Sequence, residues 1–284
     1  MSQLIDSLCL GSQILAPNPK AFPLDPDRFL SSEPVSRIEP ADFLTHVLAQ
    51  YGAEPADLDL RPVVLLSFIP ALQHRLLRYL DMPAPQPQPI MRQAWYNPEG
   101  RAFSMLASPI GAPTAVMLLE QLIALGASRF LYLGFCGALA PALTIGDLFI
   151  PQQAIREEGT SYHYLPAGVE PASAPALAAV LHAEAGRQGL CVKQGRLWTT
   201  DAPYRETAEK IAGFQAAGVQ AVDMEMAALL SVAVYRGCEV TALLVVSDEC
   251  YHSTWRPGFG ASELRRGCQE AVALGAAAAN LLGA

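Results

Sequence analysis

The sequence has few basic residues, and its cysteines follow no regular spacing. Its 284 residues carry 19 Lys and Arg against 27 Asp and Glu, a formal net charge of −8. Nucleic-acid surfaces need clustered Lys and Arg, so this balance argues against a nucleic-acid partner. The six cysteines are scattered and include no C-x-x-C pair. That spacing argues against a disulfide framework and against a metal site.

Long apolar runs are also missing. No stretch reaches the roughly 20 apolar residues that cross a bilayer. Residues 1–21 show no basic segment followed by an apolar one, which a secretory leader would have. We therefore expect a cytoplasmic protein with no membrane partner, and a small molecule as its ligand.

What is present is material for a large core, since 51% of the residues are hydrophobic and only 16% are charged. Short apolar runs typical of strands lie at 63–66, 130–135 and 240–246. They alternate with helical patterns, such as the one over 114–125, which Gly126 would end. This alternation predicts an α/β fold, a single domain with a mixed central β-sheet flanked by helices.

Domain boundaries follow from the loss of this alternation near the N-terminus. We expect residues 1–60 to form an extension packed on the core, with a short helix over 40–52, and residues 61–284 to form the α/β domain. The proline-rich stretch 83–89 predicts a loop.

The most informative segment is 221–249, in which acidic residues frame an apolar helix and strand. Asp223-Met224-Glu225 precede the helical pattern that Gly237 would end, and Ser247-Asp248 close the strand that follows. Ligands of open α/β sheets collect beyond the carboxyl ends of the strands. Two acidic sites around one buried unit therefore predict a ligand pocket.

These motifs resemble those of the nucleoside phosphorylase/nucleosidase family, which includes purine nucleoside and uridine phosphorylases. The resemblance covers roughly residues 60–284, because further landmarks follow in the family's order. They are Ser108-Pro-Ile-Gly-Ala-Pro-Thr114, Gly134-Phe-Cys-Gly-Ala-Leu139, Ile145-Gly-Asp147, Glu158-Gly-Thr-Ser-Tyr-His163 and Trp198-Thr-Thr-Asp-Ala-Pro-Tyr204.

The resemblance implies cleavage of an N-glycosidic bond. Asp248 matches the family's acid, which protonates or hydrogen-bonds the purine at N7, and a raised pKa would suit that role. Glu225 would accept hydrogen bonds from the ribose 2′ and 3′ hydroxyls, while Met224 packs on the sugar. A strand-end cap for Asp248 and a solvated charge for Glu225 are the alternatives.

Other residues are expected beside the substrate by the same resemblance. Trp198 would stack on the nucleobase, although packing in the core is an open alternative. Asp223 stands where purine phosphorylases usually have glutamate. Ser247, Cys136 and Gly137 complete this set, and Cys136 is interpreted as a small apolar side chain, since no base marks it as a nucleophile.

The resemblance implies that phosphate accepts the ribosyl group as a co-substrate. It implies no other cofactor. The family's phosphate-binding residues are altered. Ser67-Phe-Ile-Pro70 followed by Ala71-Leu72 replaces its Gly-Asp-Pro-containing turn and the arginine just after it, Tyr132 replaces its second arginine, and Phe135 replaces its Ser or Thr. As replacements for the anion contacts we consider the following: backbone N–H groups of Gly111 and Gly134, and the side chain of Arg75.

Two alternatives stay open. Water would be the acceptor in the nucleosidase branch, but Gln73 falls where that branch has its activating glutamate. The chain could also be a nucleoside-binding or regulatory protein that has lost turnover. Uridine is disfavoured, because the Gln and Arg that read uracil have no match after Tyr204. The resemblance further implies a homo-oligomer, a dimer or a hexamer.

Overall fold

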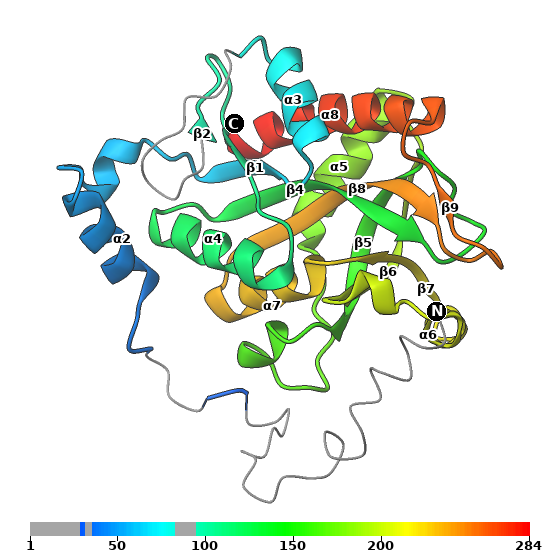
Figure 1. Cartoon of the computed structure of the whole chain (residues 1–284). Helices are drawn as coiled ribbons and strands as arrows, with labels where there is room; N and C mark the ends of the chain where they lie inside the picture. Colours follow the sequence, from blue (N-terminus) through cyan, green and yellow to red (C-terminus); the bar gives the residue numbers. More distant parts are fainter. Residues whose placement is uncertain (1–28, 32–35, 83–94) are drawn as a thin grey trace, which may run out of the picture.

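The structure is a computed structural model that describes residues 29–31, 36–82 and 95–284. Within these residues a nine-stranded sheet has the order β2-β3-β1-β4-β7-β6-β5-β8-β9, and β4 also pairs with β8. The extra pairing closes part of the sheet on itself, which Figure 1 shows as the curved centre of the molecule. The strands are β1 (Val63–Ser67), β2 (Trp95–Tyr96), β3 (Ser104–Ala107), β4 (Arg129–Ala138), β5 (Leu148–Glu157), β6 (Val192–Thr200), β7 (Val219–Asp223), β8 (Glu239–Glu249) and β9 (Arg256–Pro257).

Helices cover the sheet, as expected. The α-helices are α2 (Pro40–Ala49), α3 (Pro70–Tyr79), α4 (Ala112–Ala124), α5 (Pro175–Arg187), α6 (Ala208–Ala216), α7 (Met226–Arg236) and α8 (Ser262–Gly283). Short 3-10 helices are η2 (Pro55–Leu58), η3 (Ser161–His163) and η4 (Pro203–Arg205). Four of the α-helices have proline in their first turn, where the missing N–H costs nothing.

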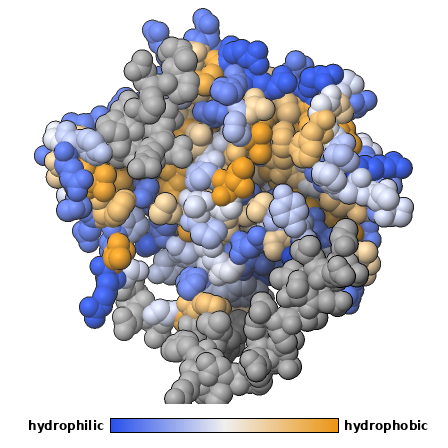
Figure 2. Space-filling model, in the orientation of Figure 1, coloured by the Kyte–Doolittle hydropathy of each residue, from blue (hydrophilic) through white to orange (hydrophobic). Residues whose placement is uncertain are grey.

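Two large apolar clusters hold these layers together. One joins the buried faces of α4 and α7 to the sheet, through side chains such as Leu119 and Leu230. The other packs α3, α5 and α8 on the opposite face, with Leu76, Leu181 and Leu274 among its members. Figure 1 shows α8 along one side of the sheet and α4 with α7 on the other. On the face drawn in Figure 2, apolar side chains gather toward the middle and hydrophilic ones around the rim.

The mixed α/β sheet is confirmed, since β1, β4 and β8 run parallel while β5 and β8 run antiparallel. Element ends differ slightly from the expected ones. The helix expected over 114–125 starts at Ala112, because Pro113 suits the first turn, and Gly126 follows it with φ 97°. Gly237 ends α7 in the left-handed conformation, with φ 70°.

The N-terminal part of the described chain packs on the core through α2. Leu44 and Leu48 of α2 are buried with Leu58, and Trp95 and Leu125 lie against them. The proline-rich segment 83–89 and most of residues 1–35 lie outside the described residues, so the division near residue 60 stays a prediction. Within the described part, no helix combines the length and apolarity that a bilayer span needs.

Close packing of α8 on the sheet generates a stability prediction. A Cβ atom on Gly267 would fall on the carbonyl oxygen of Gly146 and 2.8 Å from Val245 Cγ1. We expect Gly267→Ala to lower the free energy of unfolding by about 1–3 kcal/mol, because the helix must shift. Gly186→Ala is the matched control, since a Cβ there meets nothing within 4 Å and the extra methyl favours the helix. Urea unfolding of both variants checks this, and equal effects would contradict it.

Candidate active site

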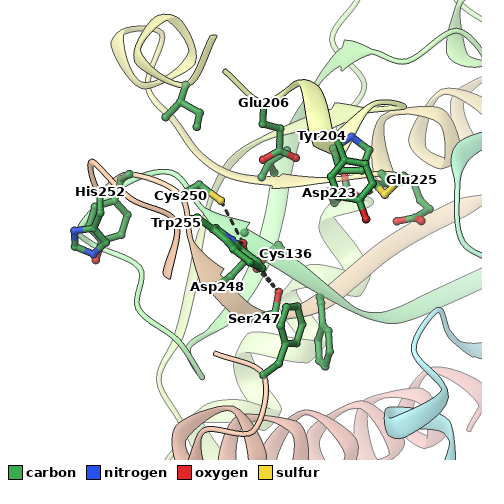
Figure 3. A pocket seen from close by; sticks show the side chains of 18 of the residues that line it. Cys136, Tyr204, Glu206, Asp223, Glu225, Ser247, Asp248, Cys250, His252 and Trp255 are labelled. Carbon is green, nitrogen blue, oxygen red and sulfur yellow. Dashed lines mark hydrogen bonds between the residues drawn. The ribbon is translucent and has the colours of Figure 1, made fainter. Parts of the chain in front are cut away.

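A cavity of about 840 Å³ lies beyond the carboxyl ends of β4, β7 and β8. Asp223, Glu225, Asp248 and Glu206 all line it, and Figure 3 shows them around the same space. The predicted pocket between the two acidic sites is therefore present in the structure, because Asp223 and Asp248, which are 25 positions apart along the chain, border the same cavity.

Asp223 fixes the start of α7. Its Oδ2 accepts the backbone N–H of Met226 at 2.8 Å and that of Glu225 at 3.2 Å. Its Oδ1 accepts the hydroxyl of Thr199 at 2.6 Å, and that hydroxyl oxygen in turn accepts the N–H of Ala227 at 2.9 Å. Burial raises the pKa of Asp223, while these hydrogen bonds act to lower it. Asp223 is thus a helix cap that also borders the cavity.

Glu225 follows directly from this cap. It is 6% exposed, and its Oε1 accepts the N–H of Gly111 at 2.7 Å. Burial, and next the neighbouring charge of Asp223, raise the pKa of Glu225 above its usual range. A buried carboxyl group held by one oxygen at a cavity wall suits a ligand that supplies hydroxyl donors.

Asp248 reaches the cavity through an irregularity in β8. Cys136 pairs with Val246 and Gly137 pairs with Asp248, so Ser247 is an extra residue that bulges from the ladder. Both Ser247 and Asp248 consequently border the cavity, although regular alternation would send them to opposite faces. Ser247 Oγ donates to Asp248 Oδ1 at 2.6 Å, and the Trp255 indole donates to Oδ2 at 2.7 Å (Figure 3).

Glu206 is a cavity residue that the sequence interpretation missed. It follows η4, and burial first, then the charge of Asp248, raises the pKa of Glu206 to about 7. The thiol of Cys250 lies between the two carboxyl groups and hydrogen-bonds Asp248 Oδ2 at 3.3 Å. The signal was available in Arg205-Glu206-Thr207, which we interpreted only as lacking the uracil-reading residues.

Most of the remaining predicted residues also lie at the cavity. Met224, Ser247, Cys136 and Gly137 border it. Burial holds the pKa of the Cys136 thiol well above its ordinary value, which agrees with an apolar rather than a nucleophilic role. A Cβ on Gly137 would lie 3.3 Å from Asp248 Oδ2, so glycine leaves room for that carboxylate.

Trp198 does not border the cavity, which corrects the expected stacking on the base. It is 0% exposed, and its ring stacks on Phe214 of α6 with centroids 4.2 Å apart. Its indole N–H donates to Glu157 Oε2 at 2.8 Å. The packing alternative therefore holds. Trp198 and Thr199 point to opposite faces of β6, and Thr199 is the one that reaches Asp223.

The three anion candidates also need correction. The N–H of Gly111 is taken by Glu225, and Gly134 lies within β4, where Phe68 packs against it. Arg75 stands on α3 outside the cavity, beside Cys268 of α8. The wall near these positions is apolar instead, formed by Phe68, Ile69, Ile110 and Phe135. Among the described residues, no Lys or Arg borders the cavity.

Comparison with known proteins identifies the fold and family. The model of the phosphorylase superfamily matches residues 74–275, well over half of the chain. The chain belongs to the phosphorylase superfamily. A guanosine phosphorylase of Halorubrum lacusprofundi is 30% identical to this chain over 152 residues, which cover 52% of this chain and 61% of that protein. A uridine phosphorylase of Thermococcus kodakarensis is 40% identical over 67 residues, 24% of each protein. The chain thus matches less than two thirds of the length of each of these relatives.

Solved structures agree on the phosphorylase fold. Purine nucleoside phosphorylase from Toxoplasma gondii in complex with immucillin-H superposes with a TM-score of 0.72 at 22% identity, covering 80% of this chain and 93% of that one. AMP nucleosidase from Bacteroides thetaiotaomicron gives a TM-score of 0.68 at 22% identity, covering 86% of this chain and 97% of that one. At these identities the likeness establishes the fold.

The cap at Asp223 generates a second prediction. Thr199→Val removes a hydroxyl that bonds both Asp223 and Ala227, so we expect the free energy of unfolding to fall by about 1.5–3 kcal/mol. Thr241→Val is the matched control, because the Thr241 hydroxyl is equally buried on β8 and has no partner among the described residues. We expect that change to be neutral or stabilising. Urea unfolding of the pair measures the difference, and a Thr199→Val protein as stable as wild type would contradict the capping role.

Proposed function

We propose that this chain cleaves the N-glycosidic bond of a purine nucleoside. The observation that carries the proposal is the convergence of Glu225 and Asp248 on one cavity from the ends of β7 and β8. Cleavage needs an acid beside the leaving base and a hydrogen-bond acceptor beside the ribose. Glu225 and Asp248 offer both, and Met224, which also borders the cavity, would pack on the sugar.

In the proposed reaction the C1′–N9 bond breaks and its electron pair passes into the purine ring. Asp248 delivers a proton to N7, so the base leaves as a neutral species. The ribosyl group, which gains positive character, is held by its 2′ and 3′ hydroxyls on Glu225. Because hydroxyl donors favour the ionised form of Glu225, a bound ribose offsets the effects that raise its pKa in the empty cavity. The acceptor oxygen then bonds to C1′ from the opposite face.

We further propose a 6-oxopurine as the base. Glu206 borders the cavity beside Asp248, and with a pKa of about 7 it is substantially ionised at neutral pH. An ionised carboxylate accepts a hydrogen bond from the N1–H of hypoxanthine or guanine, whereas adenine presents an acceptor there. The relative described as a guanosine phosphorylase supports the same choice.

Phosphate is the acceptor that we propose, on the support of the phosphorylases among the relatives. Its charge would need donors, and a neighbouring copy in the homo-oligomer implied by the resemblance is the source that we propose for them. Water is the second candidate. The specific observation in its favour is the apolar wall of Phe68, Ile69 and Phe135, with no Lys or Arg among the described residues at the cavity.

The deciding experiment measures free base released from inosine, guanosine, adenosine and uridine with and without phosphate, and identifies the sugar product by mass spectrometry. Phosphate-dependent ribose 1-phosphate supports the phosphorylase. Free ribose at an unchanged rate without phosphate supports hydrolysis. Binding of a nucleoside with no release of base would replace both with a binding or regulatory role.

Substitution of the two carboxylates separates their roles. We expect Asp248→Asn to lower kcat by about 100-fold or more with a small change in KM, since amide nitrogen cannot supply the N7 proton. Glu225→Gln should lower kcat and raise KM together, because it removes a charge-assisted ribose contact. Glu209→Gln, on the exposed first turn of α6, is the control. If steady-state kinetics gave wild-type kcat and KM for both variants, the assignment of Asp248 and Glu225 to the site would be wrong.

The raised pKa of Glu206 generates a pH prediction. Its ionised fraction grows from about a tenth to about nine tenths between pH 6 and pH 8. Inosine affinity should therefore rise up to about tenfold over that range, whereas adenosine affinity should not. Calorimetric titration of wild type and Glu206→Gln checks this, because other carboxylates also titrate but the Gln variant removes only the Glu206 contribution. An identical inosine profile in both proteins would exclude Glu206 from base recognition.

A further inference from the structure

The Asp248 carboxylate is already satisfied by donors of its own chain. Oδ1 accepts from Ser247, and Oδ2 accepts from the Trp255 indole at 2.7 Å and from the Cys250 thiol at 3.3 Å. Figure 3 shows the three donors around this one carboxylate. A nucleobase that bonds Oδ2 must therefore take the place of Trp255 or Cys250, because these two donors use both lone pairs of that oxygen.

Trp255 is the donor that can leave. Ser247 is 4% exposed on β8 and also bonds the carbonyl of Cys136, and Cys250 is anchored by its N–H to the carbonyl of Ala138 at 2.8 Å. Trp255 is 59% exposed and stands seven residues beyond Asp248. The connection that carries it is fixed at both ends, since the N–H of Gly258 bonds the carbonyl of Ser247 at 2.9 Å. Trp255 can thus move without disturbing β8.

The indole also has the shape of the proposed leaving group. Indole is a six-membered ring fused to a five-membered ring that carries one N–H, and a purine protonated at N7 presents its N–H in the same kind of ring. Trp255 can only donate, so its partner on Asp248 is an oxygen that carries no proton. Glu206, Cys250 and Cys136 are titratable groups that interact electrostatically with this carboxylate.

We propose that Trp255 is a built-in placeholder for the purine: its indole N–H occupies the Asp248 carboxylate until the N7–H that the purine carries once it is protonated takes its place. The inference rests on the proposed function and makes Trp255 a positioning residue of the same site.

Two inosine analogues test the displacement, because neither loses its base readily. In 9-deazainosine N7 carries a hydrogen, and in 7-deazainosine a C–H replaces N7. The chain has three tryptophans, Trp95, Trp198 and Trp255, and Trp198 is fully buried. In a Trp95→Phe background we expect 9-deazainosine to change the emission of Trp255 and to raise its acrylamide quenching about twofold. 7-Deazainosine should bind at least tenfold more weakly.

Trp255→Phe keeps a ring and removes the N–H donor. We expect this variant to bind 9-deazainosine about three- to tenfold more tightly in calorimetry, since nothing has to be displaced, and to show no emission change. Tightly bound 9-deazainosine with unchanged Trp255 emission would overturn the proposal. Weaker binding by Trp255→Phe would also overturn it, because the indole would then be a contact of the bound ligand.

A ligand-free measurement separates this inference from the proposed function. Asp248→Ala should alter the emission and quenching of Trp255 with no nucleoside present, whereas Glu209→Ala on α6 should not. If wild type binds neither analogue although Asp248→Ala alters the emission, the pairing of Trp255 with Asp248 stands and the nucleoside function fails. Unaltered emission in Asp248→Ala overturns the pairing itself.

Discussion

The site depends on one constraint, the bulge in β8 opposite Gly137. There β4 pairs with β7 on one side and with β8 on the other, so Gly137 is the register partner of both Val222 and Asp248. The extra residue, Ser247, turns two successive side chains toward one cavity. Without a side chain on residue 137 the Asp248 carboxylate can lie close to β7. The distance between Asp223 and Asp248 is therefore set by the pairing of the backbone strands and does not depend on long, flexible side chains.

Electrostatics of the cavity follow from that arrangement. Burial raises the pKa of Asp223, Glu225 and Glu206. The charge of another carboxylate raises each of these pKa values further. A carboxyl group whose pKa is higher in the folded chain than in the unfolded chain stabilises the fold at low pH, and that stabilisation is lost as pH rises through the folded value. A ligand rich in N–H and O–H donors would stabilise the ionised forms of these carboxylates near neutral pH.

Sequence reasoning predicted the features that depend on local pattern and on the strand-end rule. Asp223, Glu225 and Asp248 close two strands of the sheet, and carboxyl ends of strands meet a ligand at one edge, so their convergence was predictable. The position of the Trp198 side chain was not predictable, because neighbouring residues of a strand point to opposite faces and the sequence does not say which face of β6 meets the cavity. The bulge at Ser247 changes that alternation within β8 and has no sequence signature here.

Residues outside the strand ends were harder to predict. Glu206 lies in the turn after η4, where three-dimensional burial rather than any periodic pattern brings it to Asp248. Gly111, Gly134 and Arg75 were chosen by position relative to a family anion site, and the packing of Phe68 and Phe135 replaces that site with apolar surface. An aromatic wall with no Lys or Arg among the described lining residues weakens binding of an anion by this part of the chain alone, since burying an unpaired phosphate charge costs far more than apolar contact returns. The contacts that we propose for Asp248 and Glu225 can remain intact while the acceptor contacts change, because different strands supply them.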